Sequence, residues 1–128
     1  MASGFPAATG DVMTAAMFNG LVTYTLNTQS GSTYTVANSD LYQVLVVTSN
    51  ASTKTVTIAP DSTLTSAANG SAITFLNTGA GNLTFAAGSG VTITSVGATS
   101  AAPVLGQWKS CVAIRTSANT WVIVGAVA

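Results

Sequence analysis

Residues 41–58 read LYQVLVVTSNASTKTVTI and hold two different strand patterns a few residues apart. In Leu41–Thr48 the run is almost wholly apolar, which is typical of a central strand buried on both faces. In Lys54–Ile58 the apolar residues Val56 and Ile58 alternate with Thr, which is typical of a strand with one buried face. This stretch therefore predicts two neighbouring strands of an all-β protein.

The strand pattern continues on both sides of this stretch, with turn-forming clusters such as 79–81 and 88–90 between strands. Regular short strands separated by turns are typical of a β-sandwich or barrel. We expect residues 23–128 to form a compact antiparallel β-sandwich or barrel, jelly-roll-like, with eight or nine short strands. Beyond 41–58, strands are predicted at 22–26, 33–36, 72–77, 82–86, 91–95, 107–115 and 120–124, and longer loops at 59–71 and 96–104.

Residues 1–22, MASGFPAATGDVMTAAMFNGLV, differ from the rest because Met, Ala and Phe concentrate there. Thr14 and Gly20 are placed to begin and end one short helical turn. A turn of this length is not stable alone, so its large apolar side chains must pack on something else. We predict an N-terminal arm that contacts a neighbouring molecule through Phe5, Pro6, Met13, Met17 and Phe18.

The chain is poor in charge. Its 128 residues include three basic and three acidic ones, 5% in all, against about a quarter in ordinary soluble domains. The net charge is zero and the mean hydropathy is +0.52. Neutral surfaces tend to associate, so we expect the chain to be covered by copies of itself or by a larger assembly. The alternative is a monomer coated in neutral hydroxyl groups.

The residue types needed for catalysis are scarce. The chain has no His and no Glu, and Cys111 is its single cysteine. Acid–base catalysis would rest on three Asp residues in predicted loops, and a nucleophilic Cys111 would have no His beside it. We therefore predict no enzymatic activity, no cofactor and no metal site. Three basic side chains can neutralise few phosphate groups, so nucleic acid is not an expected partner. No apolar stretch has the length of a membrane span, so a membrane is not expected either.

Three polar features have structural interpretations. Asp40 is expected to accept hydrogen bonds in a turn or cap. Lys54, Lys109 and Arg115 are expected to be solvated strand-edge charges or partners between subunits. The motif Thr-x-Thr recurs from Thr23 to Thr94, but at uneven intervals. Ranks of Thr in register are the device of ice-binding proteins, whereas uneven spacing favours Thr that simply solvates an outward face.

Two stretches resemble known families. Residues 5–19, FPAATGDVMTAAMFN, resemble the opening segment of many phage tail-appendage and head-associated proteins, in which an aromatic-Pro pair leads to Gly-Asp-Val and then Thr-Ala. The span 27–128 is similar to a β-rich module that recurs in predicted phage structural proteins. The matching pieces are NTQSGSTYTV (27–36), TVTIAPDST (55–63), GNLTFAAGSGVTITS (81–95) and NTWVIVGAVA (119–128).

This resemblance implies a virion structural role, usually as a homotrimer. In long tail fibres the module follows a shaft, whereas here it begins about 20 residues from Met1. That favours a capsid decoration (cement) protein on the outer surface of a phage head, with the major capsid protein and itself as partners. The alternative is a tail-fibre or head-fibre tip module that binds a host receptor or glycan. The aromatic residues available for sugar stacking, all predicted to lie in strands and to pack there, are Tyr24, Tyr34, Tyr42, Trp108 and Trp121.

Overall fold

The computed structural model describes Ala15 and residues 23–128. The predicted arm, residues 1–22, therefore lies outside the described residues except for Ala15. The same holds for its predicted contact residues Phe5, Pro6, Met13, Met17 and Phe18.

The described residues form strands and one short 3-10 helix, η1, so the all-β prediction is confirmed. The elements in chain order are β1 (Thr25–Gln29), β2 (Thr33–Thr35), η1 (Asn38–Leu41), β3 (Val44–Thr48), β4 (Lys54–Ile58), β5 (Ala72–Asn77), β6 (Leu83–Ala87), β7 (Thr92–Ser95), β8 (Val104–Leu105), β9 (Lys109–Ser117) and β10 (Thr120–Gly125).

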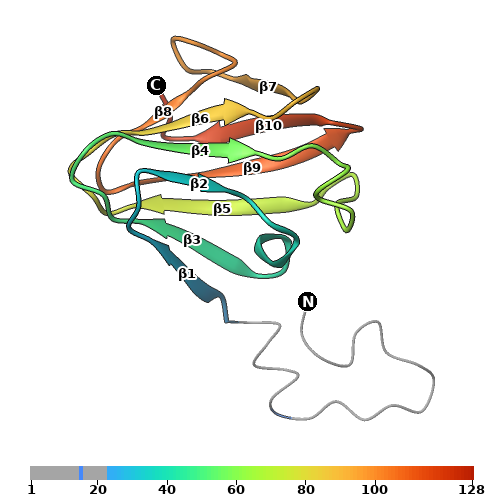
Figure 1. Ribbon diagram of the computed structural model, residues 1–128, viewed down its shortest axis with the longest axis horizontal. Coiled ribbons are helices and arrows are strands. Elements are labelled where there is room, and N and C mark those ends of the chain that lie inside the picture. The colour runs from blue at the N-terminus through green and yellow to red at the C-terminus, as the bar shows by residue number, and fades with distance from the viewer. Residues whose placement is uncertain (1–14, 16–22) are drawn as a thin grey trace.

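The strands build two mixed sheets, and the chain alternates between them (Figure 1). A six-stranded sheet has the order β1-β3-β5-β9-β10-β7, and a four-stranded sheet has the order β2-β4-β6-β8. From β1 to β8, each strand lies in the sheet that the preceding strand does not join. The chain therefore winds as a coil, in which β1, β3 and β5 are parallel, as are β2, β4 and β6.

The antiparallel arrangement expected from the sequence is wrong. Among the described residues, five of the eight strand pairings are parallel. The turns at 49–53 and 78–82 carry the chain across to the other sheet instead of back along a hairpin. A turn signal in the sequence marks where a strand ends but does not specify which sheet the next strand joins.

Successive turns of this coil lie directly against each other. The backbone N–H of Lys54 donates to the carbonyl of Asn82 (2.9 Å), and that of Gly81 donates to the carbonyl of Asn50 (3.1 Å). A Cβ atom on Gly81 would come within 1.9 Å of the carbonyl oxygen of Ser52. Glycine is therefore required at this contact, because any side chain would force the two turns apart.

A C-terminal hairpin is inserted into the six-stranded sheet. Strand β9 pairs antiparallel with β5, and β10 pairs antiparallel with β9. Strand β7 then pairs in parallel with β10 instead of joining β5. The strands predicted at 107–115 and 120–124 thus form a hairpin, and its turn residue Asn119 has a φ of 50°.

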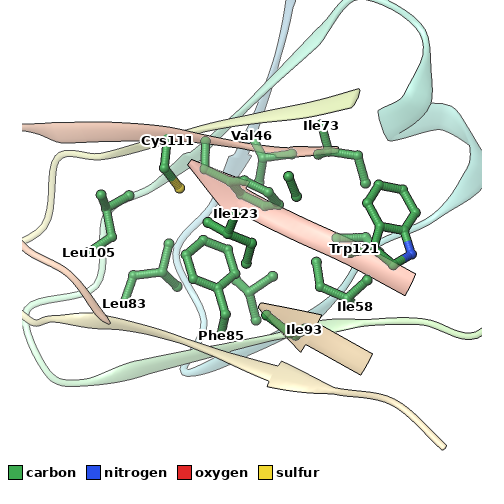
Figure 2. Packing of buried hydrophobic residues seen from close by; sticks show 14 of the residues in the cluster. Val46, Ile58, Ile73, Leu83, Phe85, Ile93, Leu105, Cys111, Trp121 and Ile123 are labelled. Carbon is green, nitrogen blue, oxygen red and sulfur yellow. The ribbon is translucent and has the colours of Figure 1, made fainter. Parts of the chain in front are cut away.

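One apolar cluster draws inward-facing side chains from both sheets. Figure 2 shows Ile73 of the six-stranded sheet and Phe85 of the four-stranded sheet directed into it. The rings of Phe75 and Phe85 meet edge to face, with their centroids 4.9 Å apart. Cys111 belongs to this cluster as a buried free thiol, and burial raises its pKa to about 12.

Candidate interaction surface

The outer side of the six-stranded sheet carries a continuous row of mainly apolar residues. Strand register aligns Leu26, Leu45, Thr74, Val112 and Val124 across five strands, from β1 to β10. Strands about 4.8 Å apart give this row a length of about 19 Å. Leu26 at one end is 64% exposed and Val124 at the other is 44% exposed. Both ends of the row are therefore open to solvent among the described residues.

Two further rows widen this surface. Val47 lies beside Leu76 on one flank, and Ile114 lies beside Val122 on the other, all partly exposed. Residues alternate sides along a strand, so Lys109 and Arg115 of β9 occupy positions of the opposite side. We call this surface the apolar face, and it consists of Leu26, Leu45, Val47, Leu76, Val112, Ile114, Val122 and Val124.

The four-stranded sheet presents threonine where the other sheet presents apolar residues. Thr33, Thr55 and Thr84 are aligned across β2, β4 and β6, and Thr35 lies opposite Thr57. The two Thr-x-Thr pairs of β2 and β4 thus stack in register, although the sequence spacing did not indicate it. In a parallel coil, strands of successive turns can align even when different numbers of residues separate them in the sequence. We call these five residues the threonine face.

The described charges are held away from both faces, beginning with Asp40. Its buried carboxylate accepts hydrogen bonds from Asn27 Nδ2 (2.8 Å), the Tyr34 hydroxyl (2.5 Å) and the backbone N–H of Ala37 (2.9 Å). This confirms the prediction of a turn or cap acceptor. Burial, together with the bond to Asp40, raises the pKa of Tyr34 to about 12. The carboxylate joins β1, β2 and η1, so its role is structural.

Lys54 is buried between the sheets, which corrects the expectation of a solvated strand-edge charge. Only 1% of the residue is exposed, and its Nζ donates to the carbonyl of Gly31. Alternation along β4 places Lys54 on the same side as the buried residues Val56 and Ile58. Burial disfavours the charged form and lowers the pKa of the lysine.

Arg115 and Asp61 form an ion pair within the chain. Arg115 Nη2 lies 2.7 Å from Asp61 Oδ2, and Arg115 Nε lies 3.2 Å from Asp61 Oδ1. The same carboxylate accepts the backbone N–H of Asn119 (3.0 Å), and Arg115 Nη1 donates to Asn69 Oδ1 (2.6 Å). The hydrogen bond from Arg115 lowers the pKa of Asp61, and that bond raises the pKa of Arg115. This cluster fastens the 59–71 loop to the β9–β10 hairpin.

The aromatic residues divide into buried and exposed sets. Trp121 in β10 is fully buried, and its Nε1 has no hydrogen-bond partner among the described residues. Tyr34 lies in β2, as predicted. Trp108 and Tyr24 lie outside the strands and are 71% and 53% exposed, so the prediction of strand packing is wrong for both. Tyr42 also lies outside the strands, between η1 and β3. Trp108 has a φ of 61°, an uncommon value for a bulky residue.

Within residues 23–128 and Ala15, no group of three or more His, Cys, Asp or Glu side chains is placed to hold a metal ion. None of the helical segments in this described part is long and apolar enough to cross a membrane. Comparison with protein-family models, with curated proteins and with solved structures finds no match to this chain. The sequence indicated neither face as a unit. Strand periodicity marked single outward positions, but only the register shows which of them are neighbours.

Proposed function

We propose that this protein is a structural component of a bacteriophage virion, a cement protein that binds the outer surface of the head. It assembles as a homotrimer, binds the major capsid protein and stabilises the shell. Its two sheets act as the layers of a β-sandwich. The observation that carries this proposal is the apolar face, five strands wide and without a charged side chain from those strands.

A surface of this kind suits a mechanical role. Apolar area removed from water is worth about 25 cal/mol per Å² and requires no ion pair to be desolvated. Exposed apolar patches of this extent on soluble proteins mark interaction sites. The threonine face supplies the opposite property, because its hydroxyl groups remain hydrated without charge. A shell subunit with both faces can pack against neighbours on one side and meet solvent on the other.

The decisive experiment compares phage particles with and without the protein. Particles that lack it should assemble but lose resistance to heat and to osmotic shock. Fluorescently labelled protein should bind such heads at many copies per particle and restore their resistance. If the labelled protein is found at a few copies on the tail, and heads without it are as robust as wild type, the cement function is wrong.

The exposed Trp108 favours a second candidate, a fibre-tip module that binds host glycan. Sugars stack on exposed aromatic rings, and Trp108 is 71% exposed beside the first residue of β9. In this case Trp108→Ala should abolish binding of labelled protein to host cells, while Tyr24→Ala tests the other exposed ring. Unchanged cell binding by both variants, or no binding by the wild type, would exclude this function.

A further inference from the structure

Residues 23–128 leave the apolar face without a cover. Parallel strands normally have both faces covered and read as near-continuous apolar runs. Strand β3 reads VLVVT, but the chain fully buries only its inward residues Val46 and Thr48. Leu45 and Val47 on the other side remain partly exposed. The strand pattern therefore calls for a second layer that residues 23–128 do not supply.

We propose that residues 1–22 of a neighbouring copy form this layer and lie on the apolar face. The inference rests on the proposed homotrimer and identifies the contact that would hold it together. The position of the segment is the first argument. It leads into β1, the edge strand of the six-stranded sheet, whose second residue, Leu26, begins the apolar row. Each copy thus carries the segment at the rim of the face.

Composition and reach provide the second argument. The segment holds Phe5, Met13, Met17 and Phe18 and a single charged side chain, Asp11, which suits a surface without charge. At about 3.3 Å per residue, 22 residues span up to about 70 Å when extended. Six strands at about 4.8 Å give a sheet about 24 Å wide. The segment is long enough to leave its own domain and cross the sheet of the next copy.

Symmetry decides between this segment and a second apolar face as the occupant. Two identical faces packed on each other form an isologous contact, which produces a two-fold dimer. An arm placed on a face is a heterologous contact, which closes into a ring when the rotation allows it. In a homotrimer each copy would donate one arm and accept one. The arm therefore fits the proposed trimer, whereas face-to-face packing does not.

Crosslinking of the full-length chain tests this contact. We would mix a Met17→Cys variant with a Val112→Cys variant, unfold and refold them together, and add a short bismaleimide. Cys111 is buried with a raised pKa, and a Cys111→Ala background removes it from the reaction. The expected product is a two-chain band that joins Met17→Cys to Val112→Cys. The matched control pairs Met17→Cys with Thr57→Cys of the threonine face and should give at least tenfold less product.

Each outcome separates the inference from the function on which it rests. Sedimentation equilibrium of the wild type gives the oligomeric state independently. A trimer in which Val112→Cys crosslinks only to Val112→Cys, or to no arm, overturns the inference and leaves the trimer standing. A double variant, Met17→Cys with Val112→Cys, that crosslinks only within one chain also overturns it. A wild-type monomer overturns both. A Met17→Ser and Phe18→Ser variant adds a test without crosslinks, because it should raise the labelling rate of Val112→Cys at least tenfold.

Discussion

The apolar face and the threonine face are built on the same coil and differ most in their side chains. Both use its parallel strands, which place residues from successive turns side by side, and the antiparallel hairpin β9–β10 extends the apolar face alone. One presents Leu, Val and Ile, and the other presents Thr33, Thr35, Thr55, Thr57 and Thr84. The backbone therefore decides which outward residues are neighbours, while the residue type decides whether that surface meets water or another molecule. Threonine suits the hydrated side because it favours strands and binds water without charge.

A lysine placed on each face should give the largest contrast. Val112→Lys puts a charge where we propose that subunits meet, and an unpaired buried charge costs about 3–5 kcal/mol per copy. We expect this variant to sediment as a monomer at micromolar concentration, at the 12.7 kDa chain mass. Thr57→Lys on the threonine face should keep the mass of the wild type. Equal masses for the two variants would remove the functional distinction between the faces.

The layer beneath the apolar face should make the protein sensitive to alkali. The thiol of Cys111 has a pKa of about 12 in the folded chain, against 9.0 when unfolded. The unfolded chain therefore loses this proton first, and stability falls as pH rises from 9 towards 12. At 1.36 kcal/mol per pH unit, the loss is about 3 kcal/mol by pH 11.

Urea unfolding at pH 8 and pH 11 measures this loss, and Cys111→Ala should remove most of it. A second, smaller fall should remain in that variant. The pKa of Tyr34 is raised from 10.0 to about 12, so above pH 10 this residue also lowers the stability of the folded chain. If Cys111→Ala loses as much stability as the wild type between pH 8 and pH 11, the thiol is not buried as described.

Lys54, which lies beneath the threonine face, should respond in the opposite direction. Burial lowers the pKa of Lys54 in the folded chain below its value of 10.5 in the unfolded chain. At a pH between the folded and the unfolded pKa the unfolded chain holds more protons, so stability rises with pH. Lys54→Met removes both this rise and the cost of the buried charge. We expect a gain of about 1 kcal/mol at pH 7, measured by urea unfolding. Lys109→Met, at an exposed position, is the control and should leave stability unchanged. A loss of stability in Lys54→Met would show that the bond to Gly31 outweighs the burial cost.

The smallest expected effect is that of salt on assembly. With no charged side chain from its strands on the apolar face, there are few ion pairs for salt to screen. The trimer dissociation constant should change less than about threefold between 0.05 M and 0.5 M sodium chloride. Sedimentation equilibrium at both concentrations measures it. A large weakening by salt would mean that charged residues outside this face hold the subunits together.

Local patterns predicted single strands well. Strands β4 and β5 have the bounds predicted from the sequence, and in β4 the alternation of Thr with Val56 and Ile58 marks the buried side. Strand β1 runs from Thr25 to Gln29, so it begins and ends three residues later than the predicted strand at 22–26. The two-residue strand β8 was not predicted, because two residues are too few to show a period; it begins at the last residue of the predicted 96–104 loop.

Long-range features could not be predicted in the same way. Whether a turn reverses the chain or carries it to another sheet depends on packing, so the parallel coil was missed. Lys54 was predicted to be a surface charge because the Gly31 carbonyl that accepts its hydrogen bond lies 23 residues earlier in the chain. The apolar face could not be predicted for the same reason. Leu26 and Val124 belong to one row only because three strands, β3, β5 and β9, connect them in register.

The inserted hairpin has a consequence for the order in which the protein is made. Strand β7 pairs with β10 in the six-stranded sheet, and β10 leaves the ribosome about 25 residues after β7. Strands β1 to β6 can pair with one another as soon as they are made, whereas the backbone groups of β7 stay unpaired until β10 is made. A chain that ends before Thr120 would carry an open strand edge on β7, and such an edge is a template for pairing with other chains. Truncated chains released from the ribosome with an end near residue 115 should therefore be more prone to aggregation than released chains that end near residue 90.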